Sequence, residues 1–158
     1  MTNKVLICGT RITAFKIDLF KNIYRDMVYK ELDAKNQYLE IIEGCCPDSA
    51  DEYAEMFGEI HNVKVYHYPS NSGNYLKRNV EMVKVCDEVI AFWDGFSYGT
   101  AQTIAQAIMN NKPVKIINLK KEVKTGNGAG AVETTDGIPP TDKSVGILEA
   151  TLWDQTKL

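Results

Sequence analysis

Two short segments combine glycine, hydroxyl and charged residues of the kinds that hold phosphate. Gly9-Thr10-Arg11 directly follows the apolar run Lys4–Cys8, and the segment DGFSYGT, from Asp94 to Thr100, follows the apolar run Glu88–Trp93. Backbone N–H groups at the start of a helix attract anions. An arginine guanidinium forms bidentate hydrogen bonds with phosphate oxygens. The segments predict an anion site, whose candidate contacts are Gly9, Thr10, Arg11, Gly95, Ser97, Gly99 and Thr100.

Further polar residues follow the same logic. Gly44 and Asp48 come after the apolar run Tyr38–Glu43, in a loop that is expected to lie beside the first segment. Arg78 is a candidate counter-charge, and Asn79 is a candidate partner for a base or a ribose. Asp94 is a candidate acceptor for ribose hydroxyls.

Each of these residues also has a structural interpretation, which the sequence leaves open. Gly99-Thr100 is compatible with an ordinary helix start, and a single exposed arginine most often pairs with a surface acid or with water. Arg78 and Asn79 fit a polar helix face. Trp93 fits a core position as well as a surface on which a base stacks.

The cysteines and histidines do not predict a metal site or a cofactor. The four cysteines include the adjacent pair Cys45-Cys46, and the two histidines are His61 and His67. Neither pattern has the spacing of a zinc site, so we predict no metal. A cysteine–histidine nucleophile pair stays open as an alternative. The run Gly126–Gly130 lacks the lysine–serine pair of a phosphate loop and favours a linker.

The elements that must position these residues follow from the hydrophobic pattern. Five apolar runs alternate with four helical stripes, which predicts an α/β, Rossmann-like parallel sheet of about five strands with helices on both faces. If the strand order is 3-2-1-4-5, the ligand site lies between the first and fourth strands. The predicted strands are 4–8, 38–43, 63–68, 88–93 and 114–119. The predicted helical stripes are Phe20, Ile23 and Met27; Ala50, Tyr53, Ala54 and Phe57; Leu76, Val80 and Val83; and Ala101, Ile104, Ala105 and Ile108.

Length and composition bound the whole chain. Its 158 residues suit one domain, which we expect at 1–119, followed by a glycine-rich linker at 120–143 and a terminal element of unknown role at 144–158. The net charge of −3 gives no general attraction to a nucleic-acid strand or an anionic membrane. There is no apolar run long enough to span a bilayer. We expect a soluble, cytoplasmic protein.

The motifs taken together resemble the SLOG superfamily, and within it the YspA or cpYpsA-related branch. The resemblance covers about residues 4–119 and rests on Gly9-Thr10-Arg11, GCCPDSADEYA from Gly44, RNVEM from Arg78 and DEVIAFWDGFSYGT from Asp87. It implies a Rossmann-like domain that binds a nucleotide or an ADP-ribose-like ligand, acts as a sensor or sequestering protein, and forms homo-oligomers. Relatives include the LOG phosphoribohydrolases and the DNA-uptake protein DprA.

The chain departs from the hydrolases of that superfamily at one place. Those enzymes carry a catalytic glutamate shortly after Gly-Thr, where this chain has Gln102 and Thr103. Glutamine cannot ionise to stabilise an oxocarbenium-like centre. The alternative is an N-glycosidic bond hydrolase in which Glu81 or Asp94 supplies the carboxylate. A third possibility is an interaction protein whose partner contact lies in the C-terminal segment.

Overall fold

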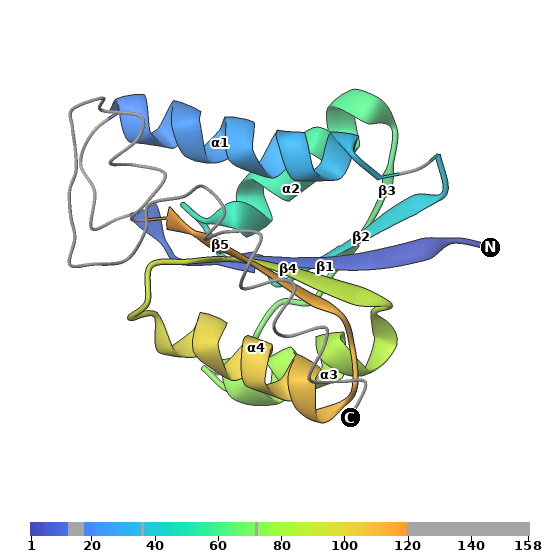
Figure 1. The fold of residues 1–158 in the computed structure, drawn as a ribbon, viewed down its shortest axis with the longest axis vertical. Coiled ribbons are helices and arrows are strands. Elements are labelled where there is room, and N and C mark those ends of the chain that lie inside the picture. The colour runs from blue at the N-terminus through green and yellow to red at the C-terminus, as the bar shows by residue number, and fades with distance from the viewer. Residues whose placement is uncertain (13–17, 36, 72, 120–158) are drawn as a thin grey trace, which may run out of the picture.

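The fold was obtained as a computed structural model, which describes residues 1–12, 18–35, 37–71 and 73–119. Strands and helices alternate along these residues, as the hydrophobic pattern predicts (Figure 1). The predicted linker at 120–143 and terminal element at 144–158 lie outside the described residues. The elements are β1 (Asn3–Gly9), α1 (Asp18–Asp33), β2 (Leu39–Glu43), α2 (Ala50–His61), β3 (Lys64–His67), α3 (Tyr75–Val85), β4 (Glu88–Trp93), α4 (Tyr98–Met109) and β5 (Val114–Asn118).

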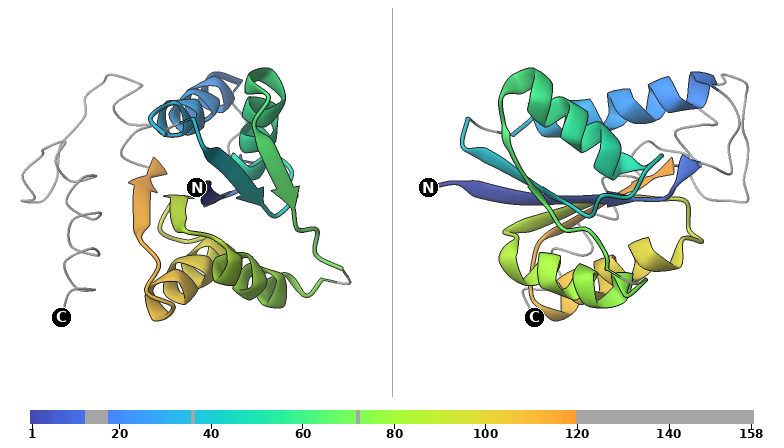
Figure 2. Two further views of the ribbon diagram at one scale, coloured as in Figure 1. Left: turned by 90° about the vertical axis from the view of Figure 1, so that its right-hand side faces the viewer. Right: turned by 180° about the vertical axis from the view of Figure 1, so that it is seen from behind.

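The five strands form one sheet in the order β3-β2-β1-β4-β5, and every neighbouring pair is parallel. The predicted fold class and the conditional strand order are thereby confirmed. Helices α1 and α2 cover one face of the sheet, and α3 and α4 cover the other (Figures 1 and 2). In the described part of the chain, no helix combines the length and apolar character needed to cross a membrane.

Each face of the sheet has its own hydrophobic core. The first core packs α1 and α2 on the sheet and includes the fully buried Tyr24 and Phe92, whose ring centroids are 5.8 Å apart. The second core packs α3 and α4 and includes Leu6, Met82 and Ile104. Because the central strands β1 and β4 are buried on both faces, their sequences are continuous apolar runs without polar alternation.

The buried faces of the two helices beside the second core differ from the predicted stripes. In α3 the buried residues are Arg78, Asn79, Met82 and Val83, whereas Leu76 and Val80 are half-buried. In α4 the buried residues are Thr100, Thr103, Ile104 and Ala107, whereas Ala105 and Ile108 are exposed. The prediction counted apolar residues alone. Polar side chains occupy these buried positions because they have hydrogen-bond partners: the Thr103 hydroxyl donates to the Gly99 carbonyl at 3.0 Å.

Candidate functional site

The central strands β1 and β4 end side by side. From there the chain continues to one face of the sheet after β1 and to the other face after β4. β1 and β4 pair up to the register Gly9–Phe92. The helix that follows β1 covers one face, and the helix that follows β4 covers the other (Figure 2). The loops after the two strands therefore diverge and leave the carboxyl edge between them, which is where open parallel sheets bind ligands.

Thr10 and Asp94 join these two loops. The Thr10 hydroxyl donates to Asp94 Oδ1 at 3.1 Å, and the Asp94 backbone N–H donates to the Thr10 hydroxyl at 3.2 Å. The Thr10 backbone N–H donates to the Phe92 carbonyl at 2.9 Å, and the Tyr24 hydroxyl donates to the Thr10 carbonyl at 3.1 Å. Thr10 is buried, so these bonds fix the relative position of the two loops.

The Asp94 carboxylate also organises its own loop. Its Oδ1 atom accepts hydrogen bonds from the backbone N–H groups of Phe96 at 2.8 Å and Ser97 at 2.9 Å. Burial acts to raise the pKa of Asp94, but these two N–H groups and the Thr10 hydroxyl outweigh it and lower that pKa. Asp94 is therefore a carboxylate at neutral pH, suited to accept hydrogen bonds from hydroxyl groups.

The turn after Asp94 requires glycine at position 95, whereas position 99 has space for a side chain. Gly95 has a φ of 89°, a conformation that side-chain-bearing residues rarely adopt. A Cβ atom built on Gly99, in contrast, would meet the Tyr75 ring at 3.6 Å, which is ordinary van der Waals contact. The protein's own packing therefore does not require glycine at position 99.

The first turn of α4 faces this edge. Ser97 is the N-cap residue, but among the described residues its hydroxyl pairs with the Thr100 hydroxyl at 3.1 Å and does not cap the helix. The carbonyl of Ser97 is held by the Trp93 indole N–H at 3.0 Å. Phe96 and Tyr98 are 75% and 67% exposed, and Arg11, in the loop after β1, is also exposed. The arrangement offers positive backbone dipole, a cation and aromatic surface within one loop cluster.

Arg78 has a different environment from the one the sequence suggests. Its guanidinium is buried, and its Nη1 group donates to the Gly44 carbonyl and, at 3.0 Å, to the Tyr68 carbonyl. Its Nε group donates to Asn79 Oδ1 at 3.0 Å. A Cβ on Gly44 would lie 2.6 Å from Arg78 Nη1, so this approach requires glycine there. Arg78 thus ties the ends of β2 and β3 to α3.

Asn79 and Glu81 lie on different sides of α3. The Asn79 amide donates to the Gln102 side-chain oxygen at 3.0 Å and to the Gly99 carbonyl at 3.4 Å, so Asn79 supports the start of α4. Glu81 is exposed, while the buried face of the helix carries Arg78 and Asn79. The Gln102 side chain is therefore held by a neighbouring amide.

The first turn of α2 contains a second, more deeply buried carboxylate, which holds the loop after β2. Asp51 Oδ2 accepts hydrogen bonds from the backbone N–H groups of Gly44 at 3.0 Å and Cys46 at 3.2 Å. Burial, assisted by the charge of Glu43, raises the pKa of Asp51 to about 6. The nearby Asp48 has a φ of 54°, and its carbonyl accepts a hydrogen bond from the Ile12 N–H at 2.6 Å. This bond joins the loop after β2 to the loop after β1.

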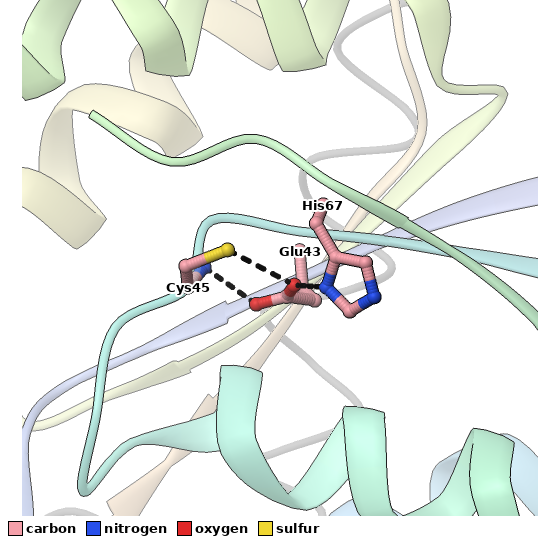
Figure 3. A group of neighbouring side chains, drawn as sticks. All are labelled: Glu43, Cys45 and His67. Atoms are coloured by element: carbon pink, nitrogen blue, oxygen red, sulfur yellow. Dashed lines mark hydrogen bonds and ion pairs between the residues drawn. The ribbon is translucent and has the colours of Figure 1, made fainter. Parts of the chain in front are cut away.

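A group of side chains that the sequence reasoning missed lies at the ends of β2 and β3. Glu43, Cys45 and His67 meet there (Figure 3). The sequence spacing gave no sign of the group because Glu43 and His67 end two different strands and Cys45 lies in the loop after the first of them. The available signal was the position of Glu43 and His67 as the last residues of consecutive strands, which pair in register.

The geometry of this group does not favour Cys45 as a free nucleophile. Burial, with the charge of Glu43 and its hydrogen bond, raises the pKa of the Cys45 thiol to about 11. The reactive form of cysteine is the thiolate, and its population at neutral pH is then small.

No protein-family model matches this chain, and no curated protein matches it.

Proposed function

We propose that this chain is a nucleotide-binding domain of the SLOG type. It holds a nucleotide or an ADP-ribose-like small molecule at the carboxyl ends of β1 and β4. The observation that carries the proposal is the Thr10–Asp94 link, which joins the two loops at the topological switch point of the sheet. The motif resemblance over residues 4–119 supports the same ligand class. Under this proposal the protein acts as a sensor or a sequestering protein, and homo-oligomers are expected.

The phosphate lies, in this proposal, between the loop after β1 and the first turn of α4. Gly9, Thr10 and Arg11 approach from one side, and Gly99 and Thr100 approach from the other. Arg11 is exposed at this edge and supplies the positive charge. Because Arg78 already donates to two carbonyls and to Asn79, we assign it to holding the loops in place.

The ribose and base follow from the remaining groups. The ionised Asp94 accepts hydrogen bonds from ribose hydroxyls, with Gly95 and Ser97 beside it. The exposed rings of Phe96 and Tyr98 offer surface on which a base stacks. Gly44 and Asp48 lie in the neighbouring loop, after β2. A single small anion suits this site better than a nucleic-acid strand, which would need a longer basic track than a chain of net charge −3 suggests.

The hydrolase alternative is less well supported. A catalytic carboxylate must reach the glycosidic bond, and Glu81 is exposed on α3 while Gln102 is neutral. Asp94 is the carboxylate at the edge, and its lowered pKa makes it a poor proton donor at neutral pH. If the purified protein released free base from AMP or NAD, as measured by chromatography, this alternative would be established instead.

Calorimetric titration with ADP-ribose and with AMP tests the proposal. We expect saturable binding, and we expect Arg11→Ala to weaken it by about 1–3 kcal/mol because one charge-assisted contact is lost. Gly99→Ala should also weaken binding, although it should not lower the unfolding temperature, because the protein tolerates a Cβ there. Absence of binding to both ligands, or unchanged affinity in both variants, would refute this site.

A further inference from the structure

A cluster outside the proposed nucleotide site carries metal-binding chemistry. We propose that Glu43, Cys45 and His67 bind a zinc ion through three protein ligands and leave a fourth coordination position open. Each residue presents one ligand atom, and these atoms lie within 4.8 Å of one another (Figure 3). Thiolate, imidazole and carboxylate are the three ligand types that zinc takes from proteins.

The sulfur–oxygen distance fits a tetrahedral centre, whereas the contact between His67 Nδ1 and Glu43 Oε1 is too close and must open to admit an ion. Cys45 Sγ lies 3.5 Å from Glu43 Oε1. Zinc–sulfur and zinc–oxygen bonds of ordinary length, at the tetrahedral angle, place the two ligand atoms about 3.6 Å apart. His67 Nδ1 contacts the same Glu43 oxygen. The His67 side chain is 44% exposed, so it has room to move aside as an ion enters between the two atoms.

The fold presents the ligands on a rigid base. Glu43 and His67 end adjacent parallel strands in register. The Glu43 side chain is 1% exposed, and the Cys45 backbone N–H donates to its other oxygen, Oε2, which orients the carboxylate. Two of the three ligands thus come from the sheet, and the third follows two residues after the strand end. Such preorganisation reduces the cost of ordering a metal site.

The surrounding charge favours a cation. Asp51 and Glu55 lie close enough for their negative charges to act on the Cys45 sulfur, in addition to Glu43. Arg78 is the opposing cation, and its guanidinium is engaged by the Gly44 and Tyr68 carbonyls. On binding, the Cys45 S–H bond breaks, its proton passes to the buffer and a zinc–sulfur bond forms, without any change of oxidation state.

The neighbouring Cys46 has other contacts. Its Sγ atom lies 3.8 Å from Arg78 Nη2 and 3.9 Å from the Gly44 carbonyl oxygen. In the part of the chain that the structure describes, the cluster therefore has three ligands. Three protein ligands with one position left for water or substrate are typical of zinc centres that activate a bound molecule.

Cobalt substitution tests the site in the full chain. The protein is stripped with a chelator and titrated with Co²⁺, which reports thiolate ligation through a sulfur-to-cobalt charge-transfer band. We expect this band to saturate at one equivalent and to disappear when Zn²⁺ displaces the cobalt. Cys45→Ser should abolish the band, and Cys45→Ser, His67→Ala and Glu43→Gln should each weaken zinc binding at least about tenfold.

Matched variants separate this cluster from adventitious binding. Cys46→Ser removes the adjacent thiol, and His61→Ala removes the other histidine of the chain, which stacks on Phe57 in α2. Both variants should keep the band and the affinity. The proposal is overturned if the wild-type chain gives no charge-transfer band, if Cys46→Ser loses it, or if all the folded variants bind zinc equally. Circular dichroism verifies that each variant is folded.

Discussion

Asp94 and Asp51 lie near the same end of the sheet, but their pKa values are shifted in opposite directions. Asp94 is partly exposed, and three hydrogen bonds to one of its oxygens outweigh burial and lower its pKa. Asp51 also accepts two backbone hydrogen bonds, but it is fully buried near Glu43, and its pKa rises to about 6. Burial and a like charge therefore decide the result at Asp51, while hydrogen bonding decides it at Asp94.

The raised pKa of Asp51 predicts a pH-dependent stability. The folded state favours the protonated form, so this contribution to stability is fully present below the ordinary pKa of 3.8 and is lost as the pH rises through about 6. Asp51→Asn is neutral at every pH and keeps an oxygen for the two backbone donors. Relative to wild type, its free energy of unfolding should rise by up to about 3 kcal/mol between about pH 4 and pH 7.

Urea unfolding of both proteins across this pH range, with a chelator present, measures the difference. A difference that stays constant with pH would show that Asp51 titrates as it does in the unfolded chain.

At the level of single residues, the sequence predicts the site unevenly. Thr10 and Asp94 were predicted as candidates, and the structure places them in contact because they follow adjacent strands. The role of Arg78 could not be predicted, because its partners are carbonyl groups of Gly44 and Tyr68, and a backbone carbonyl has no signature in the sequence. The cluster of Glu43, Cys45 and His67 was missed for a related reason: its proximity depends on strand register.

Among the elements, α3 has the least obvious role. It contributes Met82 and Val83 to the second core, and it also carries Arg78, which reaches the ends of two strands. The helix therefore connects the loop after β2 to the loop after β3. The sequence predicted the existence of α3 but misplaced its buried face, because a hydrophobic pattern gives no weight to a buried arginine whose donors are satisfied.

Arg78→Ala should therefore destabilise the fold. The variant leaves the Gly44 and Tyr68 carbonyls without their charged donor, which should reduce the free energy of unfolding by about 2–3 kcal/mol. Urea unfolding measures this loss. Lys77→Ala, on the exposed side of the same turn, is the matched control and should change stability little. Wild-type stability in Arg78→Ala, together with lost ligand affinity, would instead assign Arg78 to direct contact with the ligand.

For the molecule as a whole, topology was the most predictable property. Five apolar runs separated by helical segments permit few arrangements, since parallel crossovers are right-handed and place helices on both faces of the sheet. The strand order then puts β1 beside β4, and this adjacency alone selects the candidate edge. The chemistry of the edge depends on side-chain details, such as the Asp94 turn, that periodicity does not contain.

We propose that a phosphorylated, ribose-containing ligand binds between β1 and β4. Titration of ¹⁵N-labelled protein with ADP-ribose, followed through backbone amide chemical shifts, locates the ligand without any substitution. We expect the largest saturable shifts at residues 9–11 and 95–100. Shifts concentrated elsewhere, for example at residues 43–46 and 67–68, or the absence of saturable shifts at any concentration, would contradict it.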